Sequence, residues 1–212
     1  MYTDNKNCDF YPTPQNLIDK MLCNLDFSMI KSILEPSAGS GNIVEVLKKK
    51  EETHNKCYKE YKFDIDCIEI DQNLQHILKG KAYRVVHNDF LTYETWKEYD
   101  AIIMNPPFSN GCKHLLKALE MQSRNGGIVV CLLNAETLKN PYTKERLDLQ
   151  RKLTEYNAKV EFIQDAFLEA ERKTSVQIAL IKVQLPEVKR ESFIIEGLRK
   201  TQEKREFQKI RN

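Results

Sequence analysis

The feature that most constrains this chain is the apolar run Ala101–Met104, which leads directly into Asn105, Pro106, Pro107 and Phe108. Four consecutive apolar residues are typical of a buried parallel strand. Proline has no backbone N–H to donate to a neighbouring strand, so Pro106 must end this one. The two prolines fix φ twice and favour an extended conformation at Asn105. The sequence thus predicts a stiff loop at the carboxyl end of a strand, where open α/β sheets bind ligands.

This loop carries two hydrogen-bond acceptors and an aromatic ring. The Asn105 side-chain oxygen and the Pro106 carbonyl can together accept both hydrogens of an exocyclic amine, and Phe108 can stack on the ring that bears it. Asn-Pro-Pro-Phe after an apolar strand resembles the catalytic motif of amino-methylating S-adenosylmethionine-dependent methyltransferases, above all the adenine-N6 DNA methyltransferases. The resemblance implies catalytic roles for Asn105, Pro106, Pro107 and Phe108. It also implies that Asn105 contacts the cofactor and that Phe108 stacks on the target base. The alternative is a proline-stiffened loop without a function.

A glycine-rich segment follows a short predicted strand that ends at Glu35. Gly39 and Gly41 permit a tight turn there and let a ligand approach the backbone closely. The segment opens with an acid rather than a phosphate-binding lysine, which favours a cofactor with an amino group and no phosphates. Glu-Pro-Ser-Ala-Gly-Ser-Gly resembles the S-adenosylmethionine loop of the adenine methyltransferases. The resemblance implies that the cofactor is bound by Glu35, Pro36, Ser37, Ala38, Gly39, Gly41 and Asn42.

Near the N-terminus, Tyr11, Pro12 and Thr13 precede Pro14 and apolar residues at positions 17, 18, 21, 22 and 25. This spacing predicts an amphipathic helix with Pro14 in its first turn and Thr13 as its cap. Tyr-Pro-Thr-Pro before such a helix resembles the leading motif of DNA adenine methyltransferases that place it ahead of the glycine-rich loop. The resemblance implies that Tyr11, Pro12 and Thr13 contact the methionine carboxylate at the helix N-terminus. The alternative is a helix that only packs on the sheet.

Residues 66–71 predict a second strand that ends in two acids. A carboxylate at this distance after a glycine-rich turn usually meets a ribose diol. The resemblance implies that Glu69 binds the ribose hydroxyls of the cofactor, with Ile70 beside it, while Asp71 caps the next helix. The alternative is that both acids only cap the following helix and make the surface soluble.

The third predicted strand covers residues 85–90. The resemblance implies that Asp89 accepts a hydrogen bond from the cofactor's adenine amine and that Phe90 packs near its ring. In this family, the loop between the last two strands lies over the target base. The resemblance therefore implies base contact by Phe167, and for Lys173 either a phosphate contact or a solvated position.

The composition of the chain restricts which other classes of protein it can belong to. With 212 residues, 41% of them apolar, the chain is long enough for one domain with a core. The net charge of +2 neither requires nor excludes a nucleic-acid partner. The six cysteines form no Cys-x-x-Cys pair, which predicts reduced thiols. The four histidines are scattered without ligand spacing, so we expect them to be structural and expect no metal site. A polar N-terminus and the lack of an apolar run of bilayer length predict a cytoplasmic protein without a membrane segment.

Strand-like segments alternate with helical ones, which indicates a doubly wound α/β fold. The resemblance adds a Rossmann-like class I methyltransferase sheet of seven strands whose last strand is antiparallel. We expect residues 1–185 to form the catalytic domain and residues 186–212 a charged, helical tail. The implied activity is direct methyl transfer from S-adenosylmethionine to the N6 amine of a flipped-out adenine in DNA, as in restriction–modification. The product is S-adenosylhomocysteine, and no metal takes part.

No segment for target-site recognition is evident. Recognition is therefore minimal, belongs to a partner subunit, or lies in a longer protein of which this chain is a fragment. An RNA adenine-N6 methyltransferase would share the main motifs, although Tyr-Pro-Thr-Pro favours DNA. A protein glutamine N-methyltransferase also uses Asn-Pro-Pro with an aromatic residue, usually tyrosine. A non-catalytic cofactor-binding subunit is disfavoured because no motif residue is visibly broken.

Overall fold

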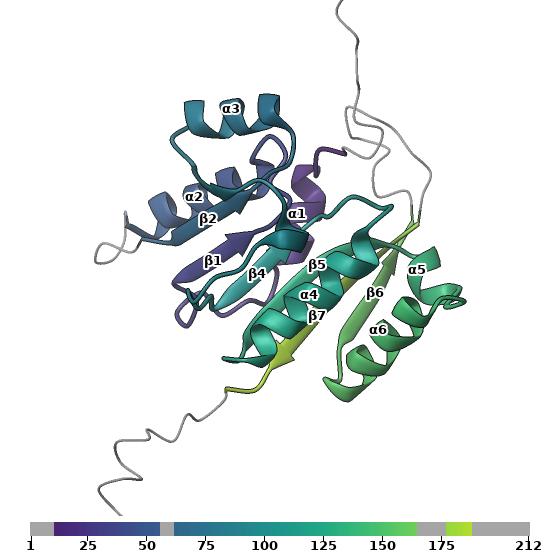
Figure 1. Cartoon of the computed structure of the whole chain (residues 1–212). Coiled ribbons are helices and arrows are strands. Elements are labelled where there is room, and N and C mark those ends of the chain that lie inside the picture. The colour runs from purple at the N-terminus through teal and green to yellow at the C-terminus, as the bar shows by residue number, and fades with distance from the viewer. Residues whose placement is uncertain (1–10, 56–61, 165–176, 188–212) are drawn as a thin grey trace, which may run out of the picture.

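The computed structural model describes residues 11–55, 62–164 and 177–187. Within them, seven strands form one sheet in the order β3-β2-β1-β4-β5-β7-β6 (Figure 1). The strands are β1 Ser32–Glu35, β2 Asp64–Ile68, β3 Arg84–His87, β4 Ala101–Met104, β5 Gly127–Asn134, β6 Lys159–Ile163 and β7 Ile178–Leu185. All pairs are parallel except those of β7, which runs antiparallel to β5 and β6. The predicted seven-stranded sheet with an antiparallel last strand is confirmed.

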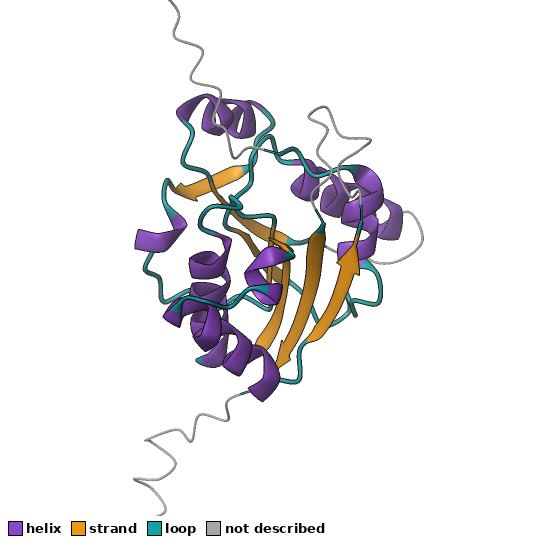
Figure 2. Ribbon diagram, turned by 90° about the vertical axis from the view of Figure 1, so that its right-hand side faces the viewer, coloured by secondary structure: helices purple, strands orange, loops and turns teal. Residues whose placement is uncertain are grey.

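Helices cover both faces of the sheet (Figure 2). They are α1 Gln15–Leu22, α2 Asn42–Asn55, α3 Gln72–Gly80, α4 Gly111–Ser123, α5 Glu136–Lys139 and α6 Lys144–Glu155, with a 3₁₀ turn η1 Phe90–Thr92. Side chains of α1 and α2 join the core on one face, and those of α4 and α6 join the core on the other. No helix in the described part of the chain is long and apolar enough to cross a membrane.

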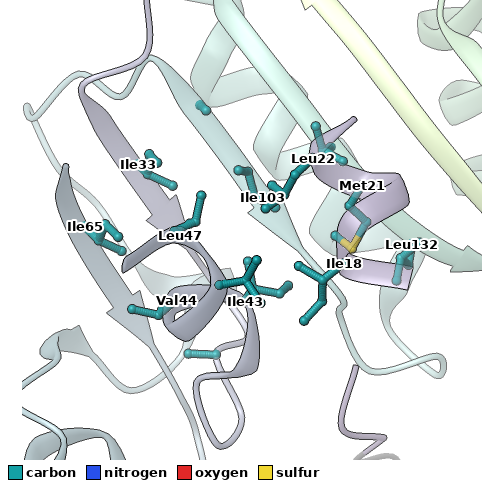
Figure 3. Packing of buried hydrophobic residues seen from close by; sticks show 14 of the residues in the cluster. Ile18, Met21, Leu22, Ile33, Ile43, Val44, Leu47, Ile65, Ile103 and Leu132 are labelled. Carbon is teal, nitrogen blue, oxygen red and sulfur yellow. The ribbon is translucent and has the colours of Figure 1, made fainter. Parts of the chain in front are cut away.

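The central strands bury both of their faces because side chains alternate along a strand. In β1, Ile33 joins the core on the α1 and α2 side, and Leu34 joins the opposite core. In β4, Ile103 and Ile102 do the same, and all four side chains are fully buried. Figure 3 shows Ile33 and Ile103 packed with side chains of α1 and α2. Burial on both faces makes β4 a continuous apolar run in the sequence, which is why it was predictable.

The strand order fixes where a site can lie. β1 and β4 are neighbours, and the chain leaves β1 toward β2 and β3 on one side before it returns to β4 on the other. The loops after parallel strands meet at such a switch point. β2 ends at Ile68 and β3 at His87, each earlier than predicted, and Asp71 and Asp89 cap the elements that follow. Glu69 therefore lies in a loop at this edge of the sheet.

Candidate active site

A pocket lies at the carboxyl edge of the sheet. The segment before α1 and the loops after β1, β2, β3 and β4 line it. Every residue predicted to be catalytic or to bind the cofactor lines this pocket, with the exception of Gly41. Phe167 and Lys173, predicted to contact the substrate, lie outside the described residues. No group of three or more His, Cys, Asp or Glu side chains in the described part of the chain is placed to hold a metal ion.

The glycine-rich loop after β1 is a tight turn held by backbone hydrogen bonds. The Ala38 N–H donates to the Ile68 carbonyl at 3.0 Å, and the Gly41 N–H donates to the Ala38 carbonyl at 2.8 Å. Gly39 and Gly41 have φ angles of 56° and 85°, which glycine adopts without a steric penalty. A Cβ atom on Gly41 would lie 2.8 Å from the Tyr83 ring. Gly41 therefore faces the Tyr83 ring and does not line the pocket.

Two buried acids line the pocket without a basic partner among the described residues. Glu35 is 1% exposed, and its Oε2 has no hydrogen-bond partner among the described residues. Glu69 is 7% exposed, and its oxygens accept the backbone N–H groups of Gly39 at 2.7 Å and Asp71 at 2.9 Å. Burial and the charge of Glu69 raise the pKa of Glu35 well above its usual value, and burial raises the pKa of Glu69. No described lysine or arginine lines the pocket, so these acids favour a cationic ligand.

The loop after β4 holds the Asn105 amide in one orientation. Asn105 Nδ2 donates to the Tyr11 carbonyl at 3.2 Å and to Thr13 Oγ1 at 3.0 Å. Asn105 Oδ1 is buried and has no hydrogen-bond partner within the described residues. The Phe108 ring stacks on Tyr11 with 5.3 Å between centroids and 23° between planes. The loop thus offers an acceptor that has no described partner, and its Phe108 ring is stacked on Tyr11 of the segment before α1.

The prediction that Thr13 caps the first helix is wrong. α1 begins at Gln15, and its N-cap residue is Pro14, which has an extended backbone with φ −68° and ψ 154°. Thr13 lies one residue too early to cap this helix, and the N-cap residue Pro14 makes no side-chain capping hydrogen bond. The Thr13 hydroxyl instead accepts the hydrogen bond from Asn105, and Thr13 is 7% exposed.

Two acids cap the elements that follow them. Asp71 accepts from the backbone N–H groups of Asn73 and Leu74 at the start of α3, which confirms its predicted capping role. Asp89 accepts from the Leu91 N–H at 2.9 Å and caps η1, a contact that the sequence did not predict. Asp89 also lines the pocket, and its contact with a cofactor adenine stays a prediction.

His114 was expected to be structural, yet it lines the pocket. Its ring lies 5.7 Å from the Phe90 ring, and burial lowers its pKa, so the imidazole is neutral at pH 7. His114 Nδ1 lies 3.0 Å from the Asn110 carbonyl, which can only accept. Nδ1 therefore carries the proton, and Nε2 is an acceptor. Its place one helical turn after Asn110, just beyond the loop that follows β4, is the sequence signal that could have identified it.

A family model described as DNA N-6-adenine-methyltransferase (Dam) matches residues 49–209, which is more than half of the chain. The chain belongs to this family. The matched residues include the Asn-Pro-Pro-Phe loop and begin after the glycine-rich loop. The family that the sequence motifs predicted is confirmed.

Two relatives share parts of this Dam-family chain. The Type II methyltransferase M.CvrRI of Paramecium bursaria Chlorella virus XZ-6E is 25% identical over 157 residues, which cover 65% of this chain and 39% of the viral protein. The tRNA1(Val) (adenine(37)-N6)-methyltransferase of Aliivibrio fischeri (strain MJ11) is 46% identical over 41 residues, which cover 19% of this chain and 18% of that protein. The Dam-family chain thus matches less than half of the length of either relative.

A solved structure shares the fold of the Dam-family chain. The type I restriction-modification system methyltransferase subunit from Streptococcus thermophilus matches with a TM-score of 0.60 and 13% sequence identity. The match covers 84% of this chain and 45% of that subunit. At this identity, the similarity establishes a common fold.

Proposed function

We propose that residues 1–185 of this chain form the catalytic domain of a methyltransferase that methylates the N6 amine of adenine in DNA. The observation that carries this proposal is the buried, unpaired Oδ1 of Asn105 in the pocket lining. The Pro106 carbonyl follows it directly as a second acceptor. An amine that donates one hydrogen to each acceptor has its nitrogen held in a single orientation. The family description supports adenine in DNA as the substrate.

The pocket residues fit S-adenosylmethionine as the methyl donor. This cofactor carries an ammonium and a sulfonium group, and the described lining offers Glu35 and Glu69 without lysine or arginine. Glu35, whose Oε2 has no described partner, would hold the ammonium, and Glu69 would take the ribose hydroxyls. Ile70, which is 62% exposed, offers an apolar surface to the adenine ring, and Asp89 offers an acceptor to its amine. The same charge pattern disfavours a phosphate-bearing cofactor.

The proposed reaction assigns a separate task to Asn105, Pro106 and Phe108 of the catalytic loop. Bound S-adenosylmethionine supplies an electrophilic methyl group, whose carbon–sulfur bonding electrons leave with sulfur as S-adenosylhomocysteine. Asn105 and Pro106 accept the two amine hydrogens, so the nitrogen lone pair is free to form the new bond to carbon. Positive charge develops on nitrogen during this step, and the two acceptor dipoles stabilise it. The nitrogen then releases one proton to water. Phe108 offers an aromatic surface to the flipped base.

Target recognition is part of the same proposal. The match covers 39% of the viral relative, and we infer that a further domain or a partner subunit selects the DNA sequence. RNA is the second candidate substrate, because the relative named as a tRNA adenine-N6 methyltransferase is 46% identical over 41 residues.

The test is to incubate the chain with tritiated S-adenosylmethionine and, separately, mixed-sequence duplex DNA, RNA or cell-extract protein. Digestion should yield label in N6-methyldeoxyadenosine from DNA. Label in RNA or in protein glutamine instead would replace DNA as the substrate. Asn105→Ala should lower the rate about 100-fold or more and leave S-adenosylmethionine binding within about threefold. The control is Asn73→Ala on exposed α3, and wild-type rates in Asn105→Ala would contradict the proposal.

A further inference from the structure

The Asn105 amide is fixed from outside its own loop. Its Nδ2 donates to the Tyr11 carbonyl at 3.2 Å and to Thr13 Oγ1 at 3.0 Å, and Thr13 lies 92 residues earlier in the chain. A carbonyl oxygen can only accept, so the nitrogen of the amide must face the segment before α1. With the nitrogen held there, Asn105 presents its oxygen, which has no described partner, to the other side.

This constraint matters because the backbone alone leaves the amide free to rotate. Pro106 restricts the backbone of Asn105, whereas the last side-chain torsion of asparagine is broad and roughly two-fold. A rotated amide would direct N–H groups toward a substrate amine that also presents N–H groups. The acceptors before α1 therefore decide whether the loop offers an acceptor or a donor.

We propose that Thr13 is a positioning residue, which keeps Asn105 Oδ1 available to the target amine by accepting a hydrogen bond from Nδ2. This inference rests on the proposed methyl transfer to adenine. It gives Thr13 a task different from the cofactor contact that the sequence resemblance implied. The substrate amine meets Asn105, and Thr13 acts only through it.

The surroundings of Thr13 support this role. Thr13 is 7% exposed and does not cap α1, so helix capping does not occupy its hydroxyl. Its carbonyl accepts from Asn42 Nδ2 at 3.1 Å, and Asn42 Oδ1 accepts from the Ser40 hydroxyl at 2.8 Å. Ser40 belongs to the glycine-rich loop that lines the pocket. Thr13 is thus held against the start of α2 on one side and holds Asn105 on the other.

The deciding variant is Thr13→Val, which keeps the shape of the side chain and removes the acceptor. With mixed-sequence duplex DNA as substrate, we expect kcat to fall about 10- to 100-fold through the misplaced amide. The dissociation constant for S-adenosylmethionine, measured by calorimetry, should stay within about threefold of wild type, because the substitution changes the orientation of the Asn105 amide and not a contact with the cofactor. Thr13→Ser retains a hydroxyl and should restore most of kcat. The matched control is Thr137→Val, because Thr137 is also buried, at 4% exposure, but does not line the pocket.

An unchanged kcat in Thr13→Val would overturn the inference. If S-adenosylmethionine binding were weaker in this variant while kcat stayed normal, Thr13 would be a cofactor ligand and not a positioning residue.

A second measurement does not depend on the folding of that variant or on turnover. In the folded wild-type protein, the Nδ2 protons of Asn105, identified by NMR through their loss in Asn105→Ala, should exchange slowly with water. Fast exchange would overturn the inference. If wild type methylates no adenine while these protons are protected, the proposed function fails and the Thr13 to Asn105 contact stands.

Discussion

Glu69 joins two loops of the pocket through a single carboxylate. Its Oε2 accepts the Gly39 N–H at 2.7 Å, and its Oε1 accepts the Asp71 N–H at 2.9 Å. The first bond connects the end of β2 to the glycine-rich loop, which lies 30 residues earlier in the sequence. A group that fixes both loops prepares the pocket before any ligand arrives, and this lowers the entropic cost of binding.

Glu69→Ala should therefore weaken S-adenosylmethionine binding. A hydrogen bond to a charged group contributes about 1.5–3 kcal/mol, so we expect the dissociation constant to rise about 10- to 100-fold in titration calorimetry. Glu52→Ala, which removes an exposed acid of α2, is the control and should bind normally. Equal affinities for wild type and Glu69→Ala would show that the acid does not prepare the pocket.

Cofactor affinity should depend on the protonation of Glu35. Burial and the charge of Glu69 raise the pKa of Glu35 in the free protein, so at low pH the carboxyl is protonated. A bound ammonium favours the ionised carboxylate, so binding releases a proton, and affinity rises with pH until Glu35 is ionised in the free protein. Below that point, the affinity should change by up to about tenfold per pH unit.

Calorimetry between about pH 5 and 7 tests this dependence, because a free α-amino group is still protonated in that range. Glu35→Gln cannot ionise, so its affinity should be lower and its pH profile flatter. A wild-type profile as flat as that of Glu35→Gln would remove Glu35 from the cofactor site.

The sequence predicted the parts of this molecule that depend on local pattern. β4 is a buried apolar run, and the proline pair and the glycine-rich loop restrict their own backbone, so β4 and the turn after β1 were predictable. The contact between Thr13 and Asn105 was not, because it joins residues 92 positions apart. Asp66 likewise gave no signal, since its partners depend on the register that places it opposite Arg84.

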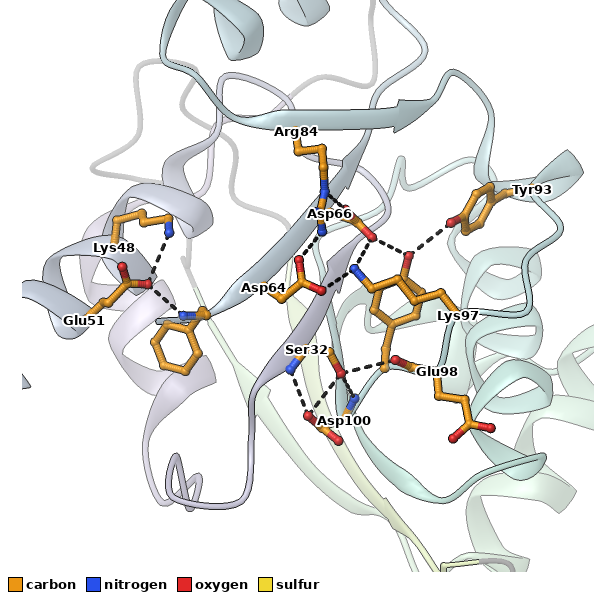
Figure 4. Close-up of polar contacts among 12 residues, drawn as sticks. Ser32, Lys48, Glu51, Asp64, Asp66, Arg84, Tyr93, Lys97, Glu98 and Asp100 are labelled. Carbon is orange, nitrogen blue, oxygen red and sulfur yellow. Dashed lines mark hydrogen bonds and ion pairs between the residues drawn. The ribbon is translucent and has the colours of Figure 1, made fainter. Parts of the chain in front are cut away.

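Asp66 is the acid at the centre of a network between β2, β3 and the segment before β4 (Figure 4). Its side chain is 3% exposed and forms hydrogen bonds with Arg84, with Lys97 Nζ at 2.7 Å and with the Tyr99 hydroxyl at 2.8 Å. Asp66→Ala leaves the buried Tyr99 hydroxyl without this acceptor, whereas water can reach the partly exposed lysine and arginine. We expect a loss of about 1–3 kcal/mol in the free energy of unfolding, measured in urea.

Asp64 is the matched control for this network. It pairs with the same Arg84 and Lys97, but its side chain is 49% exposed. Asp64→Ala should therefore cost about 0–1 kcal/mol, as exposed ion pairs do. Similar losses in both variants would mean that burial and the Tyr99 hydrogen bond do not set the stability of the network.

Lys182 of β7 anchors the helix that follows the Thr13 segment. Its Nζ donates to the carbonyls of Lys20 at 2.9 Å and Cys23 at 2.6 Å, at the end of α1, where carbonyls lack helical partners. Lys182→Met keeps the apolar stem and removes both bonds, so α1 should open more easily by about 1 kcal/mol. Hydrogen exchange of the α1 amides should then become about fivefold faster. Lys159→Met, at the exposed position opposite Lys182 in β6, should leave that exchange unchanged, and equal acceleration in the two variants would refute the anchor.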